Sequence, residues 1–152
     1  MKFQDLLAYK KSIDLAMNIF EISKKFPKEE VYSLTDQVRR SSRSVTANLA
    51  EAYRKRTYPK HFRSKLTDCD AENAETQVWI EFAYRCNYIN ENLYQELLNQ
   101  SEEVGKLINA GNTGIFRYGA SFQSTDSHIL TSIKRKNLPL QKIKDKHALS
   151  VA

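Results

Sequence analysis

Basic side chains are concentrated in one short stretch of the sequence, VRRSSRSVTANLAEAYRKR from Val38 to Arg56, which contains a single acid, Glu51. Guanidinium groups form charge-assisted hydrogen bonds with phosphate oxygens, and a row of cations gains affinity by releasing the counterions of a nucleic acid. The chemistry that this stretch predicts is electrostatic binding of RNA or DNA without sequence readout. The candidate binding residues are its six cations, Arg39, Arg40, Arg43, Arg54, Lys55 and Arg56.

The same stretch has the spacing of a helix that buries one side. Its apolar and small residues alternate steps of four and three, as in the seam of a helical bundle, at Val38, Ser42, Val45, Leu49 and Ala52. At 100° per residue the seam covers about 80° of arc, and the four arginines Arg39, Arg40, Arg43 and Arg54 fall on the opposite side. We therefore expect a buried seam and an exposed arginine face.

A charged helix face also has a more ordinary interpretation, and the sequence leaves both open. The arginines either bind phosphate or form a solvated face whose charges pair with acids of the next helix, in the same or a neighbouring chain. Those acids are Asp68, Asp70, Glu72, Glu75 and Glu81. Aromatic residues allow two interpretations as well, base stacking or packing, and packing in the core or a subunit interface is the more common one. They are Tyr53, Tyr58, Phe62, Trp79, Tyr84 and Tyr88.

Other kinds of chemistry find little support in the sequence. There is no recognisable pairing of nucleophile and base and no Gly-rich phosphate loop, so we expect no enzymatic activity. A di-iron bundle needs Glu-x-x-His pairs, which are absent, and we expect no metal or cofactor. Asn48 and Glu51 are better explained as buried polar groups that fix helix register. Cys69 and Cys86 are expected to be reduced, buried thiols.

The residues around this stretch predict four helices. The first is expected from about Phe3 to Lys25, before Pro27, and the second begins at Ser33 with Asp36 as a partial capping box. The third runs from near Lys60 with a stripe of Phe62, Leu66, Cys69, Asn73, Thr76, Val78, Trp79, Phe82, Ala83 and Cys86. The fourth follows Leu93 to Ile108, with Gly111 or Gly114 as a left-handed cap. Short loops between them predict an all-α, antiparallel up-down four-helix bundle.

The chain has 152 residues and a formal net charge of +6, and its last part differs from the rest in charge and composition. From Gly119 onward, six basic residues face two acids in a Ser-, Thr- and Lys-rich segment without a sustained apolar face. We expect residues 1–118 to form the bundle and residues 119–152 a flexible, disordered basic tail. No signal peptide or membrane-spanning run is evident, and we expect a soluble cytoplasmic protein.

Three stretches, FQDLLAYKKSIDLA, FPKEEVYSLTDQVRRSSRSVTANLAEA and AETQVWIEFAYRCNYI, carry a resemblance to a known family. In order and spacing they resemble the four-helix-bundle proteins related to the 23S rRNA intervening-sequence protein, also called S23-like. The central stretch, with its Leu-Thr-x-Gln-x-Arg-Arg and Ser-x-x-x-Asn-x-Ala-Glu runs, is the most specific. This chain has Ala52 where the family usually has Gly, and Asp70-Ala71 in place of a Gly-Ser pair.

The resemblance implies a non-catalytic bundle that assembles into a ring, typically a homopentamer. Some members of the family are encoded inside rRNA intervening sequences, and others are accessory proteins of diversity-generating retroelements that bind nucleic acid and a reverse transcriptase. Arg39, Arg40, Arg43 and Arg54 match the arginine-rich part of the motif, and Asn48 and Glu51 match its Asn-x-Ala-Glu part. The implied function is nucleic-acid binding by an oligomer; the alternative is a protein-interaction adaptor, such as a partner of a reverse transcriptase.

Overall fold

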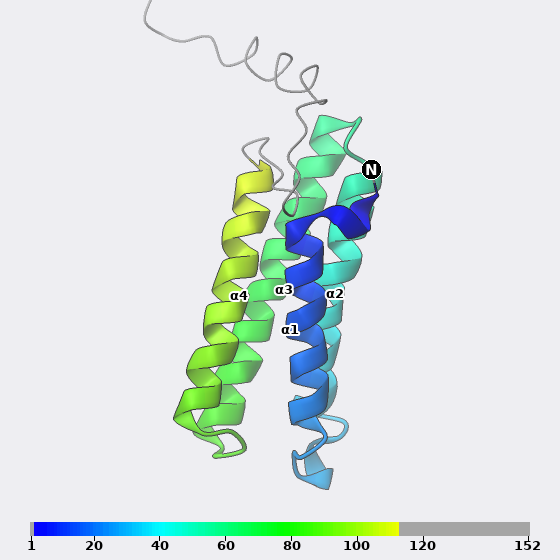
Figure 1. Ribbon diagram of the computed structural model, residues 1–152. Coiled ribbons are helices and arrows are strands. Elements are labelled where there is room, and N and C mark those ends of the chain that lie inside the picture. The colour runs from blue at the N-terminus through cyan, green and yellow to red at the C-terminus, as the bar shows by residue number, and fades with distance from the viewer. Residues whose placement is uncertain (1, 113–152) are drawn as a thin grey trace, which may run out of the picture. The chain divides into compact units, whose positions relative to one another are not determined.

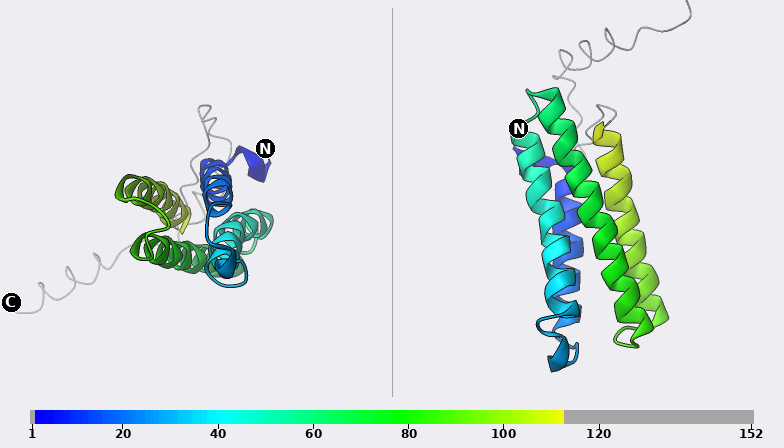
Figure 2. Two further views of the ribbon diagram at one scale, coloured as in Figure 1. Left: turned by 90° about the horizontal axis from the view of Figure 1, so that it is seen from below. Right: turned by 180° about the vertical axis from the view of Figure 1, so that it is seen from behind.

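The computed structural model describes residues 2–112, and Figure 1 shows their four long helices running alternately up and down. The elements are η1 (Phe3–Asp5), α1 (Leu7–Ser23), η2 (Lys28–Glu30), α2 (Leu34–Arg54), α3 (Pro59–Arg85) and α4 (Glu91–Asn112). Viewed along the bundle axis in Figure 2, the helices follow one another in chain order, so that α1 and α3 lie diagonally opposite. The predicted all-α antiparallel bundle is confirmed; the predicted tail and its boundary after residue 118 lie outside the described residues.

The first helix begins later than the sequence predicts. Phe3 to Asp5 form a separate 3-10 turn, closed by a 2.8 Å hydrogen bond from the Lys2 backbone N–H to the Asp5 carboxylate. Leu6 then takes an extended conformation and is fully buried, and α1 starts at Leu7. This local hydrogen bond between a side chain and the backbone stabilises a non-helical conformation of these residues. Hydrophobic periodicity alone does not predict it.

The predicted capping box at the start of the second helix is wrong, although the position of the start is right. Ser33 makes no side-chain cap. Instead, Glu30 of the preceding turn accepts a hydrogen bond from the Leu34 backbone N–H at 3.1 Å and another from the Tyr88 hydroxyl at 2.9 Å. One carboxylate therefore caps α2 and joins the two loops at this end of the bundle.

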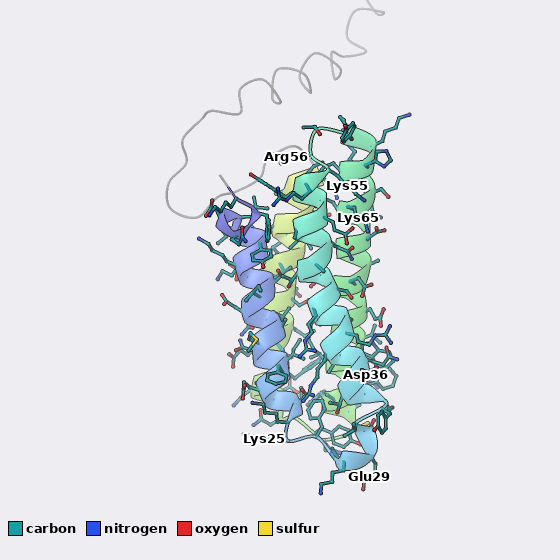
Figure 3. The ribbon with its side chains drawn as sticks, turned by 90° about the vertical axis from the view of Figure 1, so that its right-hand side faces the viewer. Lys25, Glu29, Asp36, Lys55, Arg56 and Lys65 are labelled. Carbon is teal, nitrogen blue, oxygen red and sulfur yellow. The ribbon has the colours of Figure 1, made fainter. Side chains whose placement is uncertain are left out.

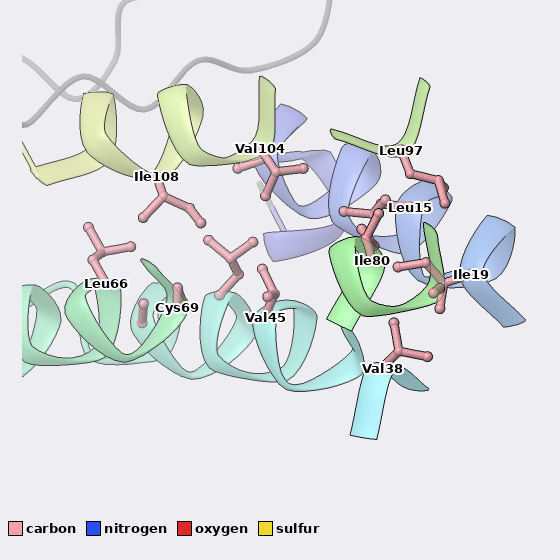
Figure 4. Close-up of a cluster of buried hydrophobic side chains, with 14 of the residues drawn as sticks. Leu15, Ile19, Val38, Val45, Leu66, Cys69, Ile80, Leu97, Val104 and Ile108 are labelled. Carbon is pink, nitrogen blue, oxygen red and sulfur yellow. The ribbon is translucent and has the colours of Figure 1, made fainter. Parts of the chain in front are cut away.

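The core contains the whole predicted seam of α2 but only part of the stripe predicted in α3 (Figure 4). All five seam residues of α2 are buried, and so are five of the ten predicted in α3, namely Leu66, Cys69, Asn73, Thr76 and Ala83. Ile80, which the prediction omitted, is 1% exposed, whereas Val78 and Phe82 are 48% and 50% exposed. The buried seam follows Asn73, Thr76, Ile80 and Ala83, and a residue two positions before or after Ile80 lies about 160° around the helix from it.

Hydrogen bonds satisfy polar side chains within this core. Asn73 donates to the Ser101 carbonyl and accepts from the Ser101 hydroxyl, both at 3.0 Å, and Gln77 donates to the same hydroxyl. Gly105 lets α4 approach here, since an added Cβ would lie 3.2 Å from the Asn73 amide nitrogen. Two further bonds, Thr76 to Ser41 and Thr46 to Ser12, cross between other helix pairs. Such pairs match only in one register, so they specify how the helices align.

The remaining turn and helix end are partly as expected. The predicted break between the third and fourth helices is present, and Asn87 takes a left-handed conformation with φ of 60°. Asn90 accepts a hydrogen bond from the Leu93 backbone N–H at 2.9 Å and so caps the start of α4. Gly111 is buried inside α4 and is not its cap, and Gly114 lies outside the described residues. Within residues 2–112, none of the helices combines the length and the hydropathy of a membrane-crossing segment.

We predict that Asn73→Ala destabilises the bundle by about 1–3 kcal/mol, because it removes the acceptor for the buried Ser101 hydroxyl and the second donor to the Ser101 carbonyl. Urea unfolding followed by circular dichroism measures the effect. Asn99→Ala, at an exposed position of α4, is the matched control and should change stability little. Equal losses in the two variants would contradict a specific role for the buried amide.

A second prediction concerns pH. The hydrogen bond from the Leu34 N–H, followed by that from Tyr88, holds the pKa of Glu30 below its ordinary value of 4.5. A lowered folded-state pKa stabilises the fold above the unfolded-state value, and this contribution disappears as the pH falls through the folded-state pKa. Glu30→Gln should therefore lower the melting temperature at pH 7, and the gap to the wild type should close below pH 4.5. Glu29→Gln, which removes an exposed neighbouring charge, should show no such pH-dependent gap.

Candidate nucleic-acid interface

The six predicted binding residues lie on α2 or directly after it, but in two separate groups. Arg39, Arg40 and Arg43 belong to the first half of the helix, and Arg54 to Arg56 to its end. At 1.5 Å per residue, about 22 Å of helix separates Arg39 from Arg54. The structure therefore does not form the single continuous patch that the sequence suggests.

The first group is held against α1. The guanidinium carbons of Arg39 and Arg43 lie 5.0 and 5.5 Å from the centre of the Phe20 ring, and the Lys24 ammonium lies 4.6 Å from it. Arg39 also donates from Nε to the Ser23 hydroxyl at 2.7 Å. Cations stacked on a ring gain a favourable electrostatic interaction. Arg39 is consequently half-buried and fixed by its own chain, while Arg43 remains exposed.

Arg40 points towards the other neighbour, α3. Its guanidinium nitrogen Nη1 lies 3.7 Å from the Oδ2 atom of Asp36, and its positive charge also acts on the carboxylate of Glu72. Burial and the charge of Glu75 raise the pKa of Glu72, and the positive charge of Arg40 opposes that rise. Arg40 therefore pairs with an acid of its own helix and not with the acids of the next helix that the sequence suggests as partners. Among residues 2–112, neither Arg39 nor Arg43 forms such an ion pair.

The second group is joined by residues that the sequence prediction did not include. Lys60 and Arg63 lie in the first turns of α3 and are exposed, directly across the short loop from the end of α2. No acid occurs between Ala52 and Leu66. We call this cluster the basic end, comprising Arg54, Lys55, Arg56, Lys60 and Arg63. Figure 3 shows Lys55 and Arg56 at the opposite end of the bundle from Lys25 and Glu29.

Two arginines of the basic end rest on aromatic rings of their own chain. Arg54 lies 5.9 Å from the ring centre of Phe3, and Arg56 lies 4.2 Å from that of Tyr53 and donates to the Tyr53 carbonyl at 2.9 Å. Both side chains nevertheless remain exposed. Ring contacts restrict the motion of a guanidinium without neutralising its charge, so the cluster keeps its positive potential.

Lys65, one turn further along α3, is already occupied by acidic and amide groups. Its ammonium lies 3.1 Å from Glu51, 3.3 Å from Asp68 and 3.2 Å from the Asn48 side-chain oxygen. Hydrogen bonds to Glu51 and Asp68 raise its pKa. Asn48 and Glu51 thus do connect two helices, but the prediction that they are buried is wrong, because Asn48 is half-buried and Glu51 is exposed.

Most of the predicted aromatic residues are engaged in packing. Tyr53 is buried, Tyr84 stacks on Tyr94 with ring centres 4.5 Å apart, and Tyr88 packs on Phe26. Tyr58 differs, because it is 65% exposed in the loop of the basic end, edge-on to the exposed His61 at 6.2 Å. The exposed ring of Tyr58 therefore stands among the cations.

The two cysteines differ from each other. Cys69 is buried as expected, and burial raises the pKa of its thiol to about 12, so almost none is ionised at neutral pH. Cys86 is exposed, which contradicts the prediction of a buried thiol. It follows α3 as its cap residue, outside the buried seam. In the part of the chain that the structure describes, no three His, Cys, Asp or Glu residues gather closely enough to hold a metal ion.

Comparisons with known proteins agree with this architecture. The family model for the 23S rRNA-intervening sequence protein matches residues 4–110, and the chain belongs to this family. A crystal structure of a protein of unknown function from the S23 ribosomal protein family of Bacteroides thetaiotaomicron is similar, with a TM-score of 0.64 and 28% sequence identity. The similarity covers 70% of this chain and 98% of that one. No curated protein matches.

Proposed function

We propose that this member of the 23S rRNA-intervening sequence protein family is a non-catalytic, cytoplasmic protein that binds RNA or DNA through its basic end, electrostatically and without reading sequence. One observation carries the proposal: five exposed or half-exposed cations from two helices meet across one short loop, with no acid from Ala52 to Leu66. Cations packed this closely neutralise several neighbouring phosphates and release their counterions.

The loop that joins α2 to α3 adds a stacking group to these charges. Tyr58 exposes most of its ring between Arg56 and Lys60, and an unpaired base can stack on such a ring. Stacking tolerates any base, so a cluster of cations around one exposed aromatic favours single-stranded nucleic acid without sequence preference. Arg39 and Arg43 have a smaller part in this proposal, because they lie about 16–22 Å of helix away from Arg54 and rest on Phe20.

A second candidate function, docking of an acidic protein partner, is favoured by a different surface. On α1, next to Phe20 and its arginines, Ile13 and Met17 are 38% and 52% exposed. Exposed apolar side chains bordered by cations suit a protein surface with acids around an apolar centre better than they suit phosphates. A reverse transcriptase is the partner that the family resemblance implies, and a further copy of this chain, in a homopentamer, is the other.

We predict that replacing three cations of the basic end, in Arg54→Ala/Arg56→Ala/Lys60→Ala, flattens the salt dependence of binding to single-stranded RNA. At about 0.7 per phosphate contact, the slope of log K against log salt should fall by about 2. A gel-shift titration over several salt concentrations with a labelled RNA measures it. Lys10→Ala/Lys25→Ala/Lys28→Ala removes the same charge from exposed positions elsewhere and is the matched control.

The nucleic-acid proposal is wrong if the wild type does not bind RNA, or if the control triple flattens the slope as much as the basic-end triple. A slope that falls only in Arg39→Ala/Arg43→Ala would move the interface to the middle of α2 and reject the basic end.

A separate prediction tests the protein-docking candidate. Ile13→Glu/Met17→Glu should abolish nuclease-resistant co-purification with a reverse transcriptase from the same genome, or reduce the oligomer mass found by light scattering. RNA binding should stay unchanged, because both positions lie on α1, away from the basic end. Unaltered partner binding and unaltered mass in this variant would reject the α1 surface as a docking site.

A further inference from the structure

The outer side of α3 combines exposed apolar side chains with acids. At helical spacing it exposes five residues, which we call the outer face of α3: Asp68, Ala71, Glu75, Val78 and Phe82. Trp79 lies beside this face, half-buried, with its ring centre 5.7 Å from that of Phe82 and its indole N–H donating to Glu75 at 3.0 Å. Large apolar side chains that stay exposed close together mark a surface that binds a partner.

The part of the bundle that contains α1 has the opposite charge. Residues 2–65, which form α1, α2 and the start of α3, contain 15 lysines and arginines against seven acids, whereas residues 66–105 contain one arginine against nine acids. Helix α1 lies diagonally opposite α3 (Figure 2). It exposes Ile13 and Met17, and Arg43 of α2 lies over Phe20, one turn further along α1. We call Ile13, Met17 and Arg43 the α1 surface.

We propose that the outer face of α3 binds the α1 surface of a second copy of this chain, with the helices of the two copies side by side and pointing the same way. The contact rests on the second candidate function above, because it identifies the apolar, acid-bordered surface that suits the α1 surface. It does not depend on nucleic-acid binding.

The two surfaces lie at the same height along the bundle. Two hydrogen bonds between neighbouring helices relate their heights, Thr46 to Ser12 and Thr76 to Ser41. Counted from these contacts at 1.5 Å per residue, Met17 lies within about 3 Å of the height of Val78, and Arg43 within about 2 Å of that of Glu75. A second copy that points the same way therefore brings Met17 to Val78 and Arg43 to Glu75 without a shift along the axis.

Charge complementarity favours this partner. Among residues 2–112, neither Arg43 nor Glu75 forms an ion pair, and the contact provides one for both. The two surfaces are different and lie on opposite sides of the bundle, so a copy that uses one of them keeps the other free. Such a heterologous contact repeats from copy to copy and builds an assembly of three or more chains, where a self-complementary contact would stop at a pair.

Mixing two variants of the full chain tests the contact. Ile13→Glu/Met17→Glu disables the α1 surface, and Val78→Glu/Phe82→Glu disables the outer face of α3. In light scattering, the wild type should have the mass of three or more chains and each variant alone the mass of one. An equimolar mixture should have the mass of two, because only one intact pair of surfaces remains. Val31→Glu/Tyr32→Glu changes exposed apolar residues outside both surfaces and is the matched control, with the mass of the wild type.

A charge exchange tests the alignment of the two copies. Arg43→Glu places like charges opposite each other and should lower the mass of the assembly. Adding Glu75→Arg to the same chain exchanges the two charges and should restore the mass.

Several results would overturn the proposal. A wild type with the mass of one chain would leave the outer face of α3 to a different, basic protein. A variant of Val78 and Phe82 that keeps the mass of the wild type would reject this face, even where the α1 variant dissociates and the second candidate function stands. A mixture that stays at the mass of one chain, a control that dissociates, or a charge exchange that restores nothing would also reject it. Because the experiment contains no nucleic acid, its outcome is independent of whether the basic end binds RNA.

Discussion

Each helix of this bundle buries only a narrow seam of side chains. Charged side chains are therefore confined to the remaining positions, which face solvent or the edge of a neighbouring helix. In α2, the seam from Val38 to Ala52 is almost completely buried, and the intervening positions must accept solvent or a neighbouring helix. Polar pairs inside the core, such as Asn73 with Ser101, then permit only one alignment of the seams. Since the seams and their register are fixed, the outer positions carry charge at defined heights around the bundle.

The short connection between α2 and α3 brings cations of two helices together. The loop between α2 and α3 is too short to separate the cations that precede it from those that follow it, so Arg54 to Arg56 meet Lys60 and Arg63. Lys65 marks the limit of the cluster, because Glu51 and Asp68 already hold its ammonium group. Within the cluster, Lys55 also pairs with Glu51, at 4.0 Å, so among the described residues Arg54, Arg56, Lys60 and Arg63 are its members without an ion pair.

The sequence predicts features that depend on periodicity and misses those that depend on a partner from elsewhere in the chain. The four helices and the buried seam of α2 follow from spacing, whereas the family follows from the resemblance of three stretches of the sequence. The cap of α2 does not, because Glu30 out-competes Ser33 only when the turn before the helix folds back. Arg39 and Arg43 lie on the predicted side of α2, yet only the packed structure brings Phe20 beneath them. In α3, apolar residues occur on both sides, so the pattern does not identify Ile80 rather than Val78 as buried.

Charge on this protein acts locally, and the net charge of +6 is a poor guide to its surfaces. Residues 2–112 carry 17 basic and 16 acidic side chains, so the bundle as a whole is almost neutral. At physiological salt the Debye length is about 8 Å, shorter than the helical distance between the basic end and Val78. A phosphate at the basic end is therefore screened from Glu75 and Glu81, the acids of α3 nearest to Val78 in the sequence. The cations of the basic end and these acids act independently because the fold keeps them far apart along α3.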